Sequence, residues 1–270
     1  MTPTAASLPV AQGRLAFPPI ASTSDYRIGY NILARRAGLR LTWIPKNMCS
    51  TLKLSFAVAE GIITAEDAPN FQNDLGQIHN WTWPLEARQA LELAAQTSVA
   101  VVREPAGRLR STMLEKAVYQ TQEEFDRIVL PILNNVAGFK GGSLPDMTFG
   151  DLLDGLEWFP DRALDHHFVS QAAFLGGAYD RLLRFEDRAA TASFFESHGI
   201  ALYTIDAHAT SRFSGELRTV SMQDPILAVR EAFAAEPGVG RVFDGEIEAG
   251  IARTVAARYA ADLELWSFAG

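Results

Sequence analysis

Residues 41–60 read LTWIPKNMCSTLKLSFAVAE, and this stretch decides the expected fold. Its first four residues are apolar or β-branched and stop at Pro45, which is the pattern of a buried strand that leaves a sheet. The residues after the proline carry Leu52, Phe56 and Ala59 at helical spacing. The stretch therefore predicts a strand, a turn of small and polar residues, and a helix, in that order.

The same unit recurs further along the chain. Residues 98–102 (SVAVV) form a continuous apolar run that is typical of a strand in a parallel sheet, and a helix is expected over 107–119. Residues 182–185 predict a third strand, followed by a helix over 187–197. Further helices are expected over 121–137 (kinked or divided at Pro131), 149–156, 222–235 and 244–263. This alternation predicts an α/β fold, with a P-loop-like parallel β-sheet flanked by helices, as a single domain with helical additions.

Length and composition set the domain organisation. A chain of 270 residues that is 48% hydrophobic can bury one sizeable core, so residues 25–270 are expected to form one domain. Residues 1–24 are rich in Pro, Ala, Ser and Thr, and predict a flexible N-terminal arm. Cys49 is the single cysteine and cannot form an internal disulfide.

Charge and hydropathy narrow the partners. The formal net charge of −8 argues against a broad nucleic-acid surface, although a local basic pocket for one small anion is compatible with it. The first twenty residues do not read as a secretory signal, and no apolar run approaches the roughly 18 residues that span a bilayer. We therefore expect a cytoplasmic protein without a transmembrane segment, and a homodimer stays open.

The segment Pro45–Lys53 is a candidate anion site. A turn that feeds a helix N-terminus offers unpaired backbone N–H groups and the positive end of the helix dipole. Ser50 and Thr51 add hydroxyl donors, and Lys46 adds a mobile positive charge. A helix capped by Ser50 or Thr51, with a solvated Lys46, explains the same residues. A nucleotide triphosphatase loop does not, because Gly-x-x-x-x-Gly-Lys-[Ser/Thr] is missing.

The segment Arg103–Lys116 is the second candidate. Arg103 follows a predicted strand directly, and the carboxyl ends of parallel strands border the crevice where open α/β sheets bind ligands. Ser111 stands eight residues later in the expected helix, within reach of the same anion. Taken alone, Arg-Glu-Pro is only a strand followed by a turn.

Together the two segments resemble the donor-binding signature of carbohydrate sulfotransferases that use 3′-phosphoadenosine 5′-phosphosulfate (PAPS). The first family motif is similar to Pro-Lys-x-Gly-[Cys/Ser]-Thr-Ser, and the second to Arg-Asp-Pro-Phe-x-Arg-Leu-x-Ser-x-x-x-x-Lys. The second motif is matched without a gap by Arg103, Pro105, Arg108, Leu109, Ser111 and Lys116. Met48 departs from the first motif, because it stands where the family often has glycine. A bulky side chain at this position limits how closely the backbone can approach a phosphate.

Three later stretches resemble the same family. Residues 165–171 (DHHFVSQ) are similar to its Asp-x-His-Trp-x-Pro-Gln segment, and residues 179–187 (YDRLLRFED) to its Tyr-Asp-x-Ile-x-[Lys/Arg]-x-Glu strand. Residues 258–266 (RYAADLELW) are similar to its closing Tyr-x-x-Asp-[Leu/Phe]-x-Leu-Phe. The five ordered matches run from residue 41 to residue 266 and imply a bacterial type of PAPS-dependent sulfotransferase.

The resemblance implies how the donor is held. The first motif would contact the 5′-phosphosulfate, through Pro45, Lys46, Asn47, Met48, Cys49, Ser50 and Thr51. Arg103 and Ser111 would hold the 3′-phosphate. Arg212 lies where the family often closes a loop over the nucleotide, and is a further candidate donor contact.

Sulfuryl transfer to a hydroxyl needs a base near the acceptor and positive charge on the departing phosphate. Lys46 is the expected electrostatic catalyst, and no metal is required. His79 stands 24 residues before Arg103, similar to the catalytic histidine of uronyl 2-O-sulfotransferases, and is the expected base. His167 is the alternative base, and Glu60 and Glu186 stay open, although Glu186 is expected to pair with arginine.

Two other interpretations remain at this stage: a P-loop-like small-molecule kinase, and a catalytically silent nucleotide-binding protein of the same fold. A chain with a net charge of −8 suits a neutral acceptor better than a long sulfated polyanion. The expected acceptor is therefore a hydroxylated carbohydrate, glycolipid or small molecule. Trp81, Trp83 and Trp158 are candidates for stacking on a sugar face, although large aromatic residues also serve as core.

Overall fold

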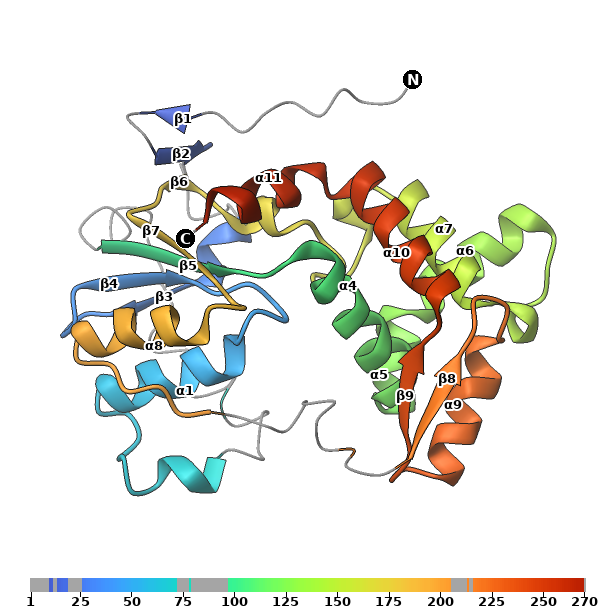
Figure 1. Cartoon of the computed structure of the whole chain (residues 1–270), viewed down its shortest axis with the longest axis horizontal. Helices are drawn as coiled ribbons and strands as arrows, with labels where there is room; N and C mark the ends of the chain where they lie inside the picture. The colour runs from blue at the N-terminus through green and yellow to red at the C-terminus, as the bar shows by residue number, and fades with distance from the viewer. Residues whose placement is uncertain are drawn as a thin grey trace. The chain divides into compact units, whose positions relative to one another are not determined.

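The computed structural model describes residues 10–11, 14–18, 26–71, 78, 97–204, 213 and 216–269 (Figure 1). The chain forms two compact units, each built from separate stretches of sequence. The first, here called the sheet unit, comprises Met1–Glu104, Ser170–Ala207 and Ala261–Gly270. The second, called the helical unit, comprises Pro105–Val169 and His208–Ala260.

A four-stranded sheet in the order β3-β4-β5-β7 forms the centre of the sheet unit. Its strands are β3 (Asn31–Ala34), β4 (Leu39–Thr42), β5 (Thr97–Val102) and β7 (Arg181–Arg184). β4, β5 and β7 run parallel, with Leu41 opposite Val99 and Val101 opposite Leu183, whereas β3 pairs antiparallel with β4. The predicted α/β fold with a mostly parallel sheet is therefore confirmed.

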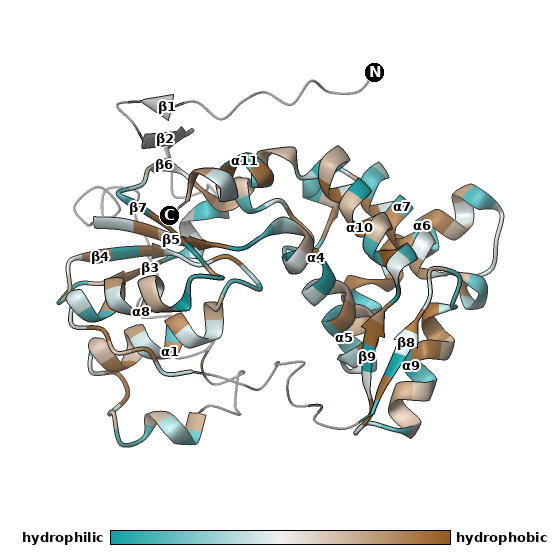
Figure 2. Cartoon of the chain, viewed as in Figure 1, coloured by the Kyte–Doolittle hydropathy of each residue, from teal (hydrophilic) through white to brown (hydrophobic). Residues whose placement is uncertain are grey.

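Alternation along the strands gives the sheet two different faces. Leu39, Leu41, Val99 and Val101 belong to one buried apolar cluster together with α1 (Cys49–Ala59) and α8 (Arg188–Ser197). These two helices lie on one side of the sheet and α11 (Ala260–Phe268) on the other (Figure 1). The second half of β5 is strongly hydrophobic (Figure 2), as expected for a central strand that is covered on both faces.

The opposite face of the sheet carries polar anchors. Thr42 shares a hydrogen bond of 2.6 Å with the buried hydroxyl of Tyr179, and the Ser98 hydroxyl donates to Asp180 over 2.9 Å. Tyr179 and Asp180 open the segment 179–187, so these contacts fix where β7 joins the sheet. They follow from alternation, because Thr42 and Ser98 point away from the apolar cluster.

A small antiparallel sheet adds strands from the N-terminal segment. Its order is β1 (Val10–Ala11), β2 (Arg14–Phe17) and β6 (Gly177–Ala178). Phe17 is buried and meets the Tyr179 ring edge-on at 5.9 Å. Part of the stretch 1–24, for which the sequence predicts a flexible arm, is thus paired through β2 with the sheet unit. The predicted extent of the arm itself stays a prediction.

The helical unit contains most of the remaining helices. They are α4 (Pro105–Met113), a π-helix (Leu114–Tyr119), α5 (Gln122–Ile128), α6 (Leu130–Lys140), α7 (Phe149–Trp158), α9 (Ile226–Ala235) and α10 (Gly245–Arg258). A parallel pair, β8 (Leu217–Val220) and β9 (Gly240–Phe243), accompanies them. Short 3₁₀ helices in the chain are Tyr26–Tyr30, Ala68–Phe71, Leu144–Asp146, Asp161–Ala163 and Gln171–Phe174.

The helix boundaries follow local signals. Pro131 sits in the first turn of α6, so the helical stretch predicted over 121–137 is divided there, as expected. Thr148 and Asp151 form a reciprocal capping box at the start of α7. The single helix predicted over 244–263 is two helices, because Tyr259 leaves helical geometry between α10 and α11. None of the helices that the structure describes has the length and apolarity that crossing a membrane requires.

Candidate functional site

The turn between β4 and α1 has an unusual backbone. Lys46 has φ 72° and Met48 has φ 60°, both in the left-handed region, whereas Asn47 between them does not have a positive φ. For residues with a side chain this conformation costs roughly 1–2 kcal/mol each. Successive peptides of alternating hand turn their N–H groups toward one side and make a concave anion site. The strain is thus concentrated where an anion would bind.

The first turn of α1 leaves donors available. No side chain caps the helix, and the first residue before it is Met48 itself. Among the residues that the structure describes, the backbone N–H groups of Met48, Cys49 and Ser50 meet no acceptor. All three residues are partly exposed, so a ligand can reach these groups. Three unsatisfied donors at the positive end of a helix dipole favour an anion.

Arg103 brings the second predicted segment to this turn within the sheet unit. β5 ends at Val102, and the next side chain, that of Arg103, donates from Nη1 to the carbonyl oxygen of Lys46 over 3.1 Å. Its guanidinium carbon also lies 4.3 Å from the centre of the Phe185 ring, which follows β7. The two segments that the sequence singled out therefore contact each other directly.

A buried carboxamide network, formed by Gln171 and Asn47, holds this contact in place. The side-chain oxygen of Gln171 accepts from the backbone N–H of Arg103 (2.9 Å) and from Asn47 Nδ2 (2.6 Å). Its Nε2 donates to the carbonyl of Arg103 over 2.9 Å, and Asn47 Nδ2 also donates to the carbonyl of Val101 over 2.9 Å. Gln171 is 0% and Asn47 1% exposed. The network ties the strained turn to the end of β5.

Asp262 anchors Gln171 in turn. This buried carboxylate accepts from the Ser170 hydroxyl (2.6 Å) and from the backbone N–H groups of Gln171 (2.8 Å) and Ala172 (2.9 Å). Asp262 belongs to the closing segment 258–266, and Gln171 to the segment 165–171. The segments 258–266 and 165–171, which are far apart in sequence, are thus joined by hydrogen bonds next to the residue that supports the turn before α1.

Glu186 has a structural position. Its two carboxylate oxygens accept from the backbone N–H of Glu104 (3.0 Å) and from the indole Nε1 of Trp266 (3.0 Å). The expected pairing with arginine is therefore replaced by these two contacts. Glu60 likewise accepts, from the backbone N–H of Arg36 over 2.9 Å.

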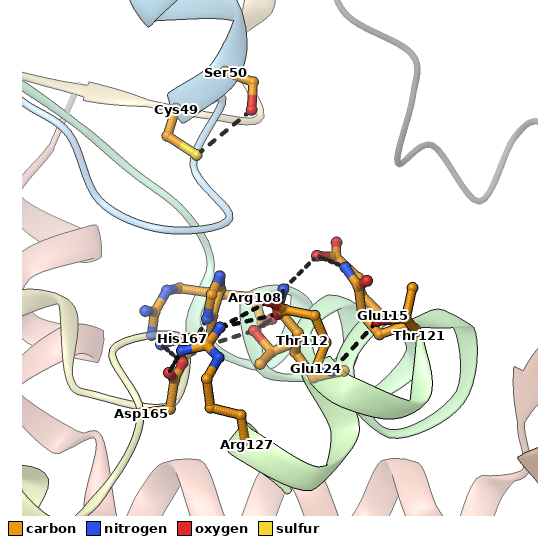
Figure 3. A network of polar contacts seen from close by, with 12 residues as sticks. Cys49, Ser50, Arg108, Thr112, Glu115, Thr121, Glu124, Arg127, Asp165 and His167 are labelled. Carbon is orange, nitrogen blue, oxygen red and sulfur yellow. Dashed lines mark hydrogen bonds and ion pairs between the residues drawn. The ribbon is translucent and has the colours of Figure 1, made fainter. Parts of the chain in front are cut away.

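The helical unit holds an Asp–His pair (Figure 3). His167 Nδ1 lies 2.5 Å from Asp165 Oδ1, and the backbone N–H of His167 donates to the same oxygen over 3.0 Å. Burial, with the charges of Lys116 and His166, lowers the pKa of His167 to about 4. The pKa of Asp165 is also lowered: burial works against this, but the hydrogen bond and nearby charge of His167 outweigh it. Near neutral pH the imidazole is thus neutral, donates from Nδ1 and keeps Nε2 as an acceptor.

Charged groups around this pair are largely balanced. Lys116 is buried and its ammonium contacts Glu115 at 3.1 Å and Glu124 at 3.7 Å, while Arg127 bonds Glu124 at 2.9 Å. Arg108, also buried, donates to the carbonyl of Val169 over 2.8 Å. Both Lys116 and Arg108 therefore support the helical unit's own fold.

The cluster Asp165, His166 and His167 also has metal-ligand geometry, with its ligand atoms within 4.8 Å of one another. Burial lowers the pKa of His166, and the charges of Lys116, Arg127 and Arg108 lower it further. The same positive charges would repel a metal cation. A hydrogen-bonded pair therefore explains the cluster better than a metal centre.

The remaining sequence-predicted residues are distributed as follows. Thr51 and Lys53 are buried in α1, where the Lys53 ammonium lies 3.5 Å from the centre of the Trp43 ring. Ser111 is half-buried in α4 of the helical unit. Trp158 is 45% exposed and packs edge-on against Phe139 at 4.9 Å. His79, Arg212, Trp81 and Trp83 lie outside the described residues.

Three residues of the site had no role assigned from sequence: Gln171, Asp262 and Phe185. Gln171 and Asp262 stood inside segments that resemble the family, but composition and periodicity do not indicate their hydrogen bonds. The inward turn of the Asn47 side chain also changes its role, because the carboxamide holds the loop and does not face a ligand.

No family model matches the chain, and comparisons with curated proteins and with solved structures found no match either.

Proposed function

We propose that the chain is a PAPS-dependent O-sulfotransferase. The observation that carries the proposal is the contact between the uncapped, left-handed turn before α1 and Arg103 after β5. These are the two segments whose sequences resemble the donor motifs, and in the sheet unit they share one hydrogen-bonded network. An anion-binding turn and an adjacent guanidinium suit a ligand with two separate anionic groups.

In this proposal the backbone of the turn binds the 5′-phosphosulfate. The N–H groups of Met48, Cys49 and Ser50 would donate to its oxygens, with the Ser50 hydroxyl beside them. Arg103 would contact the 3′-phosphate, the group that distinguishes PAPS from ATP. Ser111 and Arg212 keep their assignment as donor contacts from the resemblance.

The chemical step is an in-line displacement at sulfur. The acceptor oxygen forms a new bond to sulfur while the bond between sulfur and the bridging 5′-phosphate oxygen breaks. The acceptor proton passes to a base, and 3′-phosphoadenosine 5′-phosphate (PAP) leaves with the additional negative charge. Lys46 would stabilise this charge, without a metal.

The base is assigned to His79, with His167 as the alternative. His167 has the protonation state that a base needs, because its neutral ring is oriented by Asp165 and its Nε2 is an acceptor. Turnover decides between them: the histidine whose replacement by alanine lowers turnover by roughly 10²-fold, with PAP affinity unchanged, is the base. The acceptor is proposed to be a hydroxylated carbohydrate, glycolipid or small molecule.

Calorimetry with the whole chain tests the proposal. PAP should bind, ATP·Mg²⁺ should bind more weakly, and Arg103→Ala should weaken PAP by about ten- to a hundredfold, the effect of one charge-assisted contact. Arg181→Gln is the matched control, because it removes an exposed arginine from the opposite end of β7. A preference for ATP·Mg²⁺ would support a kinase instead, and PAP binding without sulfuryl transfer to any hydroxylated acceptor would indicate a silent binding protein.

A further inference from the structure

Phe185 in the sheet unit carries two guanidinium groups. The guanidinium carbon of Arg103 lies 4.3 Å from the ring centre, and that of Arg188 lies 3.7 Å from it. The two positive charges are therefore no further apart than these two distances together. Arg103 follows β5, whereas Arg188 is the first residue of α8, so two different elements direct arginines to one ring.

The position of Arg188 is electrostatically unfavourable as it stands. A cation at the start of a helix opposes the helix dipole, and a second guanidinium on the same ring repels it. Arg188 is an exposed residue, and the partial burial of its guanidinium lowers its pKa against the opposing charge of Glu186. The oxygens of Glu186 accept from the Glu104 N–H and the Trp266 indole.

Arg188 also has unused hydrogen-bonding capacity. Within the described part of the chain its guanidinium makes no hydrogen bond and no ion pair, and it contacts the Phe185 ring. This contact with the ring does not use the N–H donors of Arg188, because a cation–π contact is not a hydrogen bond. A dianion that contacts both guanidinium groups would offset the repulsion and the unfavourable helix position.

We propose that Arg188 and Arg103 together bind one phosphate group, with Phe185 as the ring that both guanidinium groups contact. Resting on the proposed function, this phosphate is the 3′-phosphate of the donor. Arg103 keeps one N–H on the Lys46 carbonyl, so Arg188 supplies further donors to the phosphate. Sequence resemblance assigned Arg103 and Ser111 to this group and gave Arg188 no role.

The test compares two nucleotides on matched variants of the whole chain. PAP carries the 3′-phosphate and adenosine 5′-phosphate lacks it. Arg188→Gln should weaken PAP by about ten- to a hundredfold and leave adenosine 5′-phosphate unchanged. Arg181→Gln removes the same charge from an exposed arginine at the start of β7, and this variant should bind PAP within about twofold of the unchanged protein.

The double variant Arg103→Ala with Arg188→Gln should lose less than the product of the two single losses, because both side chains share one phosphate. If Arg188→Gln itself lowers the denaturation midpoint, Arg188→Lys serves as the second variant, and it should fold normally while losing the bidentate part of the PAP affinity. The inference is wrong if Arg188→Gln binds PAP as tightly as Arg181→Gln does, or if it weakens both nucleotides equally. Failure of the unchanged protein to bind PAP is a different result, because it removes the proposed function along with the inference.

Discussion

Gln171→Leu should destabilise the protein and loosen its donor site at the same time. The side chain is fully buried, and its amide meets both the N–H and the C=O of Arg103 as well as Asn47 Nδ2. Leucine has a similar size but no polar group. Asn47 Nδ2 would keep its bond to the carbonyl of Val101, whereas the two backbone groups of Arg103 would lose their partner.

The magnitude follows from the two orphaned groups. Each buried polar group without a partner costs about 1–3 kcal/mol, and Arg103 is only half-buried, so water reaches part of the gap. We expect the free energy of unfolding to fall by about 3 kcal/mol, measured by urea denaturation. PAP affinity should fall as well, because Arg103 and the turn lose their common support.

Two variants make the comparison specific. Gln223→Leu alters an exposed glutamine and should change the free energy of unfolding by less than about 0.5 kcal/mol. Gln171→Glu keeps both accepted hydrogen bonds but sets a carboxylate against the Arg103 carbonyl. This raises the pKa of the new carboxyl in the folded state, so its stability deficit should shrink as the pH falls and the protonated group regains a donor. A Gln171→Leu protein that is as stable as the Gln223→Leu control, with unchanged PAP affinity, would refute the network.

Two more predictions concern the turn and the Asp–His pair. Met48 occupies the left-handed region, so the free energy of unfolding of Met48→Gly should stay within about 1 kcal/mol of that of the unchanged protein. The β-branched variant Met48→Val should be less stable than Met48→Gly by about 2 kcal/mol in urea denaturation. Equal stability of the two variants would contradict the assigned strain. The folded protein lowers the pKa of His167 to about 4, so this histidine gains a proton near pH 6.5 in the unfolded chain but not in the folded one. The free energy of unfolding should therefore fall by up to about 3 kcal/mol as the pH drops from 6.5 to 4. His167→Gln should flatten this slope in denaturation curves measured across that range, and an unchanged slope would show that other groups cause it.

Local patterns predicted the core of the sheet unit. The apolar runs at 98–102 and 182–185 predicted β5 and β7 to within one residue at each end, and α1 and α8 follow their strands with helical periodicity. The strand predicted over 41–44 is β4, Leu39–Thr42, which begins two residues earlier because Arg40 interrupts its apolar pattern. β3 is short and antiparallel, and was not predicted. β8 was also not predicted, because three of its four residues are exposed and it carries no continuous apolar run.

The division into two units was not readable in the same way. Of the points where the chain passes between them, those within the described residues are Glu104–Pro105, Val169–Ser170 and Ala260–Ala261, which lie inside or directly beside regular elements. The crossing at Ala207–His208 lies outside the described residues. No Gly- or Ser-rich linker marks these points. Contacts in the folded chain, and not a change of composition, define the boundary between the two units. The sequence alone therefore does not predict it.

The candidate site was predictable in its parts but not in its connections. The small and polar residues before a predicted helix, together with the resemblance, pointed to the turn at Lys46 and to Arg103. In the structure one hydrogen bond joins Arg103 to the carbonyl of Lys46. The hydrogen bonds of Gln171 to Arg103 and to Asp262 cross 68 and 91 residues of sequence. Contacts over such separations depend on the folded topology, which no local pattern contains.

The turn also explains how Met48 fits where the resembled motif often has glycine. The donors that face a ligand are backbone N–H groups, so the side chain at this position matters mainly through the cost of a positive φ. The neighbouring Asn47 and the Arg103 side chain fasten the turn on both sides of the strained peptide, and a fastened turn tolerates that cost. Residues that hold the turn should therefore be less replaceable than the residue at its tip. Loss of Gln171 should harm donor binding more than any apolar exchange at Met48 that preserves the left-handed conformation.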